Sequence, residues 1–188
     1  MKALVVYESL WGNTEQVARA VAAGLSTTEE VEVADVTTMP AVTADVGLVV
    51  LGGPTHAFSM TRPNTRADAV TQGATRCVGE VGLREWLALL PRDRDLPCAA
   101  FDTRVGSVRH LPGSAAKSAA RGVRRRGHHL VCPAHSFYVS GTAGPLLPGE
   151  LERATEWGRE LAAHVTQRGS TSALHDLGPQ QDSGGGGG

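Results

Sequence analysis

A loop close to the amino terminus carries the hydroxyl and amide side chains of an anion-binding site. An apolar segment runs into this loop, and a helix is expected to follow it. The loop reads Glu8-Ser9-Leu10-Trp11-Gly12-Asn13-Thr14. The first backbone N–H groups of a helix lack partners within the helix, and the helix dipole favours an anion beside them. Ser9 and Thr14 would add hydroxyl donors, and Gly12 would let the backbone curve around the anion.

Two further loops carry residues suited to a flat ligand. One reads Gly52-Gly53-Pro54-Thr55-His56-Ala57-Phe58-Ser59-Met60, and the other reads Asp102-Thr103-Arg104-Val105-Gly106. The former offers aromatic surface from His56 and Phe58, and the latter offers polar backbone and an arginine. If the segments before the three loops are parallel strands of one sheet, the loops meet at one end of it, where the strands finish. Together they would suit a flat aromatic ligand with a phosphate tail.

Apolar runs alternate with helical stretches along the chain, and this alternation predicts the elements that position the loops. The strand candidates are rich in Val, Leu and Ala and lack strict alternation, as expected for strands buried on both faces. They are Lys2–Tyr7, Val31–Val36, Val46–Leu51, Cys98–Asp102 and His129–Cys132. Helices are predicted from apolar positions at three-to-four spacing and from helix-start signals. They are Thr14–Leu25, Glu80–Leu90, Gly113–Arg126 and Gly149–Val165.

Five strands that alternate with helices predict an α/β fold with a doubly wound parallel sheet and helices on both faces. Because right-handed crossovers leave few topologies, we expect the strand order 2-1-3-4-5. In this order the first and third strands are neighbours whose connections leave toward opposite faces. Ligands of such sheets bind at that point, outside the carboxyl ends of the strands. The three loops would therefore surround a ligand.

The chain of 188 residues is long enough for one domain with a substantial core. We expect this domain to span residues 1–167. A disordered Gly/Ser-rich tail is expected over residues 168–188, because that segment has little apolar surface to bury. The formal net charge of −1 gives no indication of a nucleic-acid partner, and no apolar run approaches the length of a membrane span.

The three cysteines, Cys77, Cys98 and Cys132, are widely separated and form no CxxC pair. We interpret them as reduced thiols of a cytoplasmic protein. Three histidines lie near Cys132, namely His128, His129 and His135. Neighbouring positions on a strand face opposite ways, so incidental histidines are a better interpretation than a metal site.

Four arginines gather near the end of the predicted helix Gly113–Arg126. They are Arg121, Arg124, Arg125 and Arg126. Positive charge suits the carboxyl end of a helix, so a solvated helix face is the simpler interpretation. A surface that docks a partner is the alternative.

The first loop, as Tyr-Glu-Ser-x-x-Gly-Asn-Thr-Glu, resembles the phosphate loop of the flavodoxin family, and Gly-Gly-Pro-Thr at residues 52–55 resembles that family's second flavin loop. The likeness spans roughly residues 1–167. Within it, Phe-Tyr-Val-Ser-Gly-Thr-Ala-Gly-Pro-Leu at residues 137–146 is similar to a stretch of bacterial flavodoxin-domain proteins. The resemblance implies noncovalent binding of FMN and the transport of one or two electrons.

The resemblance also implies which residues form the site. The first loop would hold the FMN phosphate, the second would line the isoalloxazine, and the third would lie against its pyrimidine side. The cofactor-binding residues expected in this way are Ser9, Leu10, Trp11, Gly12, Asn13, Thr14, Pro54, Thr55, His56, Ala57, Phe58, Asp102, Thr103, Arg104 and Gly106. No side chain is assigned as a catalytic group or a metal ligand.

Two features depart from the family pattern. Trp11 stands where many flavodoxins have a threonine, and some flavodoxin-like quinone reductases and protoporphyrinogen oxidases have an aromatic residue there. Arg62, Arg66 and Arg104 lie near the expected site, and the chain is nearly neutral, whereas low-potential flavodoxins are strongly acidic. A cation close to the flavin favours the anionic reduced form, so we expect a less negative reduction potential.

The leading interpretation is an FMN-binding electron carrier that serves a redox partner protein or a small-molecule electron acceptor. The alternative is an FMN-dependent oxidoreductase that resembles quinone reductases or protoporphyrinogen oxidases, so the sequence alone does not decide between carrier and enzyme. A signalling receiver is disfavoured, since Glu8 is the one carboxylate at the ends of the first and third strands. A cofactor-free scaffold of the same fold stays open.

Overall fold

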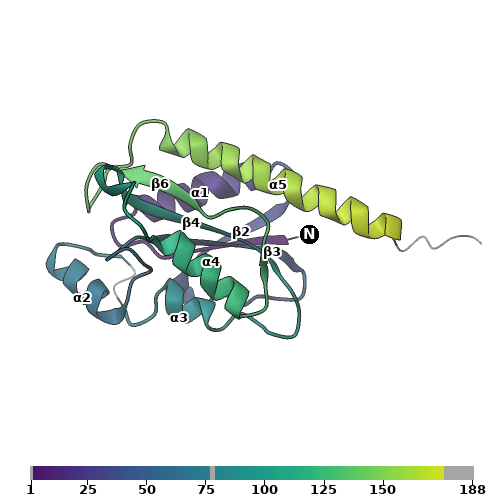
Figure 1. Cartoon of the computed structure of the whole chain (residues 1–188), viewed down its shortest axis with the longest axis horizontal. Coiled ribbons are helices and arrows are strands. Elements are labelled where there is room, and N and C mark those ends of the chain that lie inside the picture. The colour runs from purple at the N-terminus through teal and green to yellow at the C-terminus, as the bar shows by residue number, and fades with distance from the viewer. Residues whose placement is uncertain (1, 77–78, 176–188) are drawn as a thin grey trace, which may run out of the picture.

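A parallel β-sheet forms the centre of the structure, a computed structural model that describes residues 2–76 and 79–175 (Figure 1). Its strands are β1 (Lys2–Tyr7), β2 (Glu30–Asp35), β3 (Val46–Pro54), β4 (Pro97–Val105), β5 (His129–Leu130) and β6 (His135–Val139). The pairings between them are parallel, and the path through the first five is β2-β1-β3-β4-β5. The predicted strand order is confirmed.

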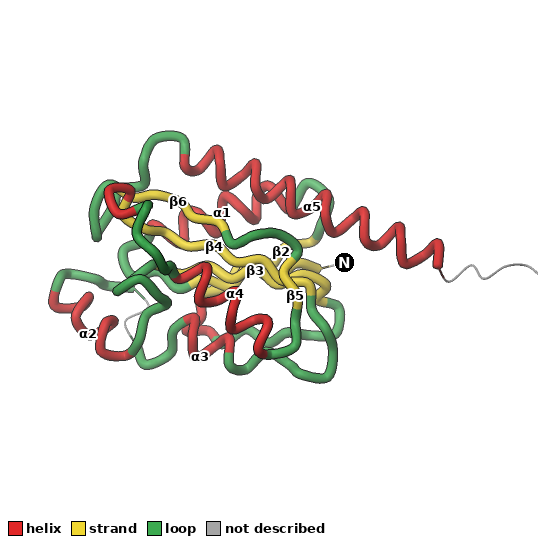
Figure 2. Tube along the Cα trace, in the orientation of Figure 1, coloured by secondary structure: helices red, strands yellow, loops and turns green. Residues whose placement is uncertain are grey.

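Helices cover both faces of the sheet, as predicted (Figures 1 and 2). One face carries α1 (Asn13–Leu25) and α5 (Glu150–His175), and the other carries α3 (Leu83–Leu87) and α4 (Ala115–Arg125). A further helix, α2 (Pro63–Thr71), follows β3, and the short 3₁₀ turns η1 (Val36–Thr38) and η2 (Gly106–Val108) follow β2 and β4. The doubly wound architecture therefore leaves the carboxyl ends of the strands uncovered by the main helices.

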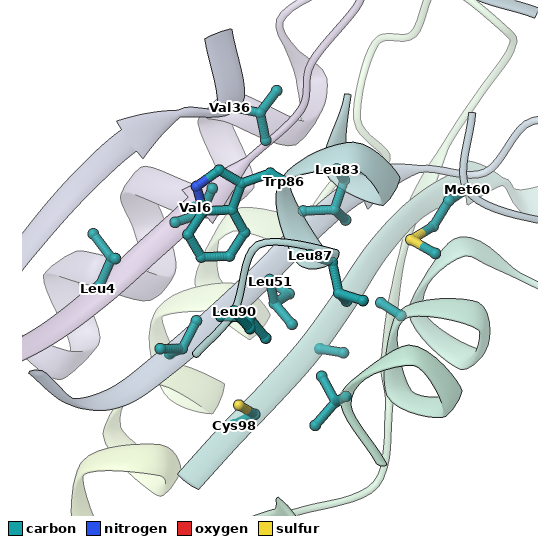
Figure 3. Packing of buried hydrophobic residues seen from close by; sticks show 14 of the residues in the cluster. Leu4, Val6, Val36, Leu51, Met60, Leu83, Trp86, Leu87, Leu90 and Cys98 are labelled. Atoms are coloured by element: carbon teal, nitrogen blue, oxygen red, sulfur yellow. The ribbon is translucent and has the colours of Figure 1, made fainter. Parts of the chain in front are cut away.

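The first strand shows why the apolar runs lack strict alternation. Successive side chains of a strand point to opposite faces. Leu4 and Val6 pack into the cluster around Trp86 on the α3 and α4 side (Figure 3). Val5 packs into the cluster around Trp157 on the α1 and α5 side. Both faces of the sheet are thus buried, and each position along β1 is apolar for its own core.

Helices α1 and α5 approach each other through two glycines. A Cβ atom built on Gly24 would lie 2.1 Å from the carbonyl oxygen of Thr155, and one built on Gly158 would lie 2.2 Å from that of Val21. Because these neighbours are backbone atoms, they cannot rotate away. Glycine at both positions is what allows the two helix backbones to touch.

Helix α2 and strand β6 were not predicted from the sequence. In α2 the buried residues are Arg66 and Ala69, so the helix lacks the apolar stripe by which helices are recognised. The fifth strand was predicted as His129–Cys132; it begins at His129 as predicted, but the predicted end was wrong. β5 ends at Leu130, and β6 then pairs with β4 farther along the same edge, from Phe101 to Val105. Pro133 lies in the interruption and has no N–H group to donate to the ladder.

Several predicted boundaries moved. The helix predicted at Glu80–Leu90 corresponds to α3, which is shorter and spans Leu83–Leu87. The helix predicted at Gly149–Val165 corresponds to α5, which continues to His175. That helix takes in residues 168–175, which were expected to belong to the tail. The rest of the expected tail, residues 176–188, and Cys77 lie outside the described residues.

Candidate functional site

A cavity of about 220 Å³ lies at the carboxyl ends of the strands, where the loops after β1, β3 and β4 meet. The sheet register brings these ends together, since Tyr7 pairs with Gly52 and Gly53 pairs with Asp102. The cavity is lined by Ser9, Leu10, Trp11, Asn13, Thr14, Pro54, Thr55, His56, Ala57, Thr103, Arg104, Val105, Val139 and Thr142. The structure therefore brings residues of all three predicted loops to one place.

Four of the expected site residues do not line this cavity. Gly12 forms the amino-terminal cap of α1, and Phe58 lies outside, with about half of its surface exposed. Asp102 is fully buried, and its Oδ2 accepts a hydrogen bond of 2.8 Å from the backbone N–H of Ala116 in α4. Gly106 begins the turn η2.

The start of α1 presents backbone N–H groups toward the first loop. Gly12 has φ of 87° and gives the helix no side-chain cap, and this left-handed conformation favours glycine. The Oγ of Ser9 accepts a hydrogen bond of 3.3 Å from the backbone N–H of Glu15. The hydroxyl of Thr14 is 2.7 Å from that of Thr103 on β4. The first and third loops are thus joined across the floor of the cavity.

Aromatic rings form one wall of the cavity. The rings of Trp11 and His56 are stacked, with centroids 5.7 Å apart and planes 7° from parallel. Burial lowers the pKa of the His56 imidazole below its usual range, because desolvation disfavours the charged ring. Ala57 and Phe58 follow with φ of 44° and 61°, in the left-handed region that residues with a Cβ seldom adopt. The backbone of this second loop is therefore strained beside the cavity.

Close packing explains why glycine occupies both Gly52 and Gly53 at the start of the second loop. A Cβ on Gly52 would lie 2.1 Å from the ring of Phe101, and one on Gly53 would lie 2.9 Å from Leu83. The pair lets a neighbouring aromatic ring and α3 pack closely against the end of β3. The Gly-Gly-Pro-Thr segment therefore supports the fold as well as the loop that follows.

A fourth loop, which was not predicted from the sequence, completes the cavity. It follows β6 and contributes Thr142, while Val139 at the end of β6 adds apolar surface. The Nδ2 of Asn13 donates a hydrogen bond of 3.0 Å to the carbonyl of Ala143, and a Cβ on Gly144 would collide with the Asn13 side chain. The signal in the sequence was the glycine-rich stretch at residues 141–144, directly after an unpredicted strand.

Arg104 is a buried cation beside the cavity. Its side chain is 5% exposed, and its Nη2 donates to the carbonyls of Val108 and Leu111 at 2.8 and 3.2 Å. Its Nε has no hydrogen-bond partner among the described residues. The positive charge is therefore held by neutral carbonyls on the loop after β4.

Arg66, by contrast, does not line the cavity. It is fully buried, and it donates from Nη1 to the hydroxyl of Thr61 at 3.0 Å and from Nε to the carbonyl of Gly79 at 2.9 Å. The same Thr61 hydroxyl donates to Glu8 Oε1 at 2.5 Å, and Glu8 Oε2 accepts from the N–H of Leu83 at 2.8 Å. This network ties the end of β1 to the segments around α2 and α3.

Burial raises the pKa of the Glu8 carboxyl above its usual range, against the opposing effects of Thr61, Leu83 and Arg66.

Arg62, the third expected cation, is an exposed residue at the amino-terminal cap of α2. Only one of the three arginines expected near the ligand, Arg104, therefore lines the cavity.

Over the described part of the chain, no group of three or more His, Cys, Asp and Glu side chains is arranged to hold a metal ion. His129 bonds Asp95 through Nδ1 at 2.8 Å, and His135 bonds Arg153 at 2.9 Å, so the two rings serve different contacts. A search of the same residues finds no helix long and apolar enough to cross a membrane.

Comparison with solved structures places the fold. A flavodoxin from the domain Archaea superposes with a TM-score of 0.58 at 20% identity, covering 88% of this chain and 99% of that one. Flavodoxin 1 of Bacillus cereus gives 0.57 at 16% identity, covering 89% and 98%. The chain has the flavodoxin-like fold. A flavodoxin, WrbA-like protein from Agrobacterium tumefaciens gives 0.55 at 15% identity, covering 88% and 98%.

No family model matches the sequence, and no curated protein matches it. The flavodoxin-like fold is therefore shared at low identity, and a shared fold does not by itself determine ligand or activity.

Proposed function

We propose that the protein binds FMN noncovalently in the cavity at the carboxyl ends of the strands and carries electrons. The observation that supports this most strongly is the cavity's combination of a helix start whose cap residue, Gly12, has no side chain, with hydroxyl side chains on one side and stacked aromatic rings on the other. A phosphate monoester needs the former, and a flat heteroaromatic ring system needs the latter.

The residues present fit the phosphate of FMN. Ser9 and Thr14 carry hydroxyl groups on the cavity wall, and the first turn of α1 starts beside them. The side chain of Asn13 is held by the fourth loop, which fixes the conformation of the first loop before any ligand arrives. Of the residues that the structure describes, no lysine or arginine lines this part of the cavity, so backbone and hydroxyl donors would bind the phosphate dianion.

The residues present also fit a flat ring system. Trp11 and His56 offer aromatic faces, and Thr55 and Thr103 offer polar groups at the carboxyl ends of β3 and β4. Bound FMN would supply one-electron and two-electron transfer, and the protein would supply position, exclusion of water and electrostatics. The cation of Arg104 would then make the reduction potential less negative than in an acidic flavodoxin.

Flavin identification tests the proposal. The purified full chain should show flavin absorption, or acquire it after incubation with FMN and removal of excess ligand. Heat release followed by chromatography should give FMN and not FAD. A chain that acquires no flavin under these conditions would be a cofactor-free scaffold, and the proposal would be wrong.

Turnover distinguishes a carrier from an oxidoreductase of the same fold. A carrier loaded with FMN needs a separate reductase, so it should oxidise NADH or NADPH only slowly with a quinone as acceptor. Sustained steady-state turnover without a reductase would assign the protein as an FMN-dependent oxidoreductase.

A further inference from the structure

A second concave surface lies next to the candidate cofactor site. Its volume is about 220 Å³, and its polar lining consists of Ser59, Arg84, Ser118, Arg121 and Arg125, which we call the arginine groove. Arg84 lies on α3, and the last three lie on α4. The groove therefore runs between two helices on one face of the sheet.

The groove shares a loop with the cofactor cavity. Ser59 belongs to the segment that also carries His56 and Ala57, which line the cavity. The backbones of His56 and Ser59 exchange two hydrogen bonds of 3.0 Å. A molecule bound in the groove would therefore lie close to the proposed flavin, because the segment 56–59 borders both sites.

Among the described residues, no carboxylate lines the groove or pairs with its arginines. Arg84 donates to the carbonyls of Thr61 and Met60 at 3.2 and 3.1 Å, and Arg121 donates to the Ser118 hydroxyl at 3.1 Å. These acceptors are neutral, so they orient the guanidinium groups and leave their charge in place. Arg125 is exposed, and its side chain has no hydrogen-bond or ion-pair partner among the described residues.

The sequence around the groove adds to its positive electrostatic potential. Seven Arg and Lys residues and no Asp or Glu occur between Thr103 and Gly149, although the whole chain has a net charge of −1. The acidic residue on α3, Glu85, accepts a hydrogen bond of 2.8 Å from the Gly82 N–H and pairs with Arg66 at 3.2 Å. Its carboxylate is thus engaged elsewhere and does not line the groove.

Hydroxyl groups add a donor. The oxygens of Ser59 and Ser118 lie 3.0 Å apart and accept from Arg84 and Arg121 respectively. One hydroxyl proton is used in the bond between the two serines. The other proton remains for an acceptor in the groove, beside the guanidinium N–H groups.

We propose that the arginine groove binds the phosphate group of a phosphorylated small-molecule electron acceptor, which would gain the electrons that reduced FMN in the adjoining cavity gives up. Planar guanidinium groups match phosphate oxygens with paired hydrogen bonds, and they bind most strongly where no carboxylate competes. The volume of about 220 Å³ holds a phosphate group together with part of the molecule that carries it. The role as reactant rests on the proposed function, whereas the phosphate site does not.

Titration of the full chain with inorganic pyrophosphate tests the site. The chain is first saturated with FMN, so that the first loop is occupied, and amide shifts are followed by nuclear magnetic resonance. The shifts should centre on Ser59, Ser118 and their neighbours. The double variant Arg121→Gln/Arg125→Gln should weaken binding at least about ten-fold, because two charge-assisted contacts are lost.

Arg124→Gln is the matched control. Arg124 is equally exposed on α4 and lies outside the groove. Its replacement should weaken binding less than about two-fold, by reducing the general field alone. Equal weakening by the control, as expected for a diffuse surface that attracts any polyanion or acidic protein, would overturn the proposal. Shifts confined to residues 9–14, or no saturable binding, would also overturn it.

A parallel titration without FMN separates the two proposals. Groove shifts and the same variant pattern in a chain that does not take up FMN would keep the phosphate site and reject the proposed cofactor. Uptake of FMN without chemical-shift changes in the groove would support the proposed cofactor and contradict the proposed phosphate site.

Discussion

Side chains around the cavity are held by contacts within the protein before any ligand is considered. Asn13 is bonded to the loop after β6, Thr14 to Thr103, and Arg104 at the end of β4 to two carbonyls of the segment that follows it. Each of these contacts joins elements that are distant in the sequence or fixes a loop at the rim. Preorganisation of this kind lowers the entropy lost on binding.

The positive φ of Ala57 predicts that glycine would stabilise this position. A residue with a Cβ in the left-handed region costs about 1–2 kcal/mol, and glycine offsets part of the gain through its greater freedom in the unfolded chain. Ala57→Gly should therefore increase the free energy of unfolding by about 0.5 kcal/mol. Chemical denaturation of the ligand-free full chain measures this.

The control for Ala57 is Ala163→Gly on the exposed side of α5, where glycine should cost about 1 kcal/mol. A loss of stability at position 57 as large as that at position 163 would contradict the strained backbone.

The lowered pKa of His56 predicts a pH dependence of stability. In the folded protein burial disfavours the charged ring, so its pKa lies below the unfolded value of 6.5. The unfolded chain then binds more protons, and the His56 contribution to stability is lost as pH falls through 6.5 toward the folded pKa. Titration of the His56 ring by nuclear magnetic resonance should give a value below 6.5, and a value above it would contradict this.

Elements are joined to one another by the buried network of Glu8, Thr61 and Arg66, which links β1 to the segments around α2 and α3. A buried pair is weak evidence for added stability, but removal of one partner leaves a buried charge without compensation. The network therefore fixes how the second loop and α2 sit beside the first loop.

Arg66→Met should lower the free energy of unfolding by about 3–5 kcal/mol at pH 7, because Thr61 and the carbonyl of Gly79 lose a buried donor and Glu8 loses the nearby cation that favours its charged form. The loss should shrink as pH falls, since Glu8 has a raised pKa and its neutral form needs no partner. Arg62→Met, on the exposed cap of the same helix, should change stability by less than about 0.5 kcal/mol. Equal losses in the two variants at pH 7, measured by denaturation, would contradict the network.

The contact between α1 and α5 predicts an inversion of the usual helix preference. Alanine normally stabilises an exposed helix over glycine by about 1 kcal/mol. Gly158→Ala should instead destabilise the protein by about 2–3 kcal/mol, because the new methyl group meets the Val21 carbonyl. Gly141→Ala, whose Cβ would have only an ordinary contact at 3.8 Å, should be tolerated in the same thermal unfolding assay.

At the scale of the whole molecule, the sheet order could be predicted because buried parallel strands read as continuous apolar runs. The three loops after β1, β3 and β4 followed directly from that order. Helix α2 could not be predicted, since it buries an arginine where an apolar stripe would be expected. The position of Arg66 depends on carbonyl groups of Gly79 and Glu80, which no local pattern reveals.

The fourth loop of the cavity was missed for a related reason. It lies after β6, and β6 exists because β4 is long enough to pair with two successive short strands. Strand length and interruption are set by tertiary pairing, so the sequence pattern around Cys132 and Pro133 indicated one strand where there are two.

The central claim is that this cavity binds FMN through both its phosphate and its ring system, and calorimetric titration of the ligand-free full chain tests it most directly. We predict one FMN per chain with a Kd of about 1 μM or lower, and riboflavin, which lacks the phosphate, at least about ten-fold weaker. Equal affinity for riboflavin and FMN would contradict the phosphate loop, and the absence of saturable FMN binding would contradict the account as a whole.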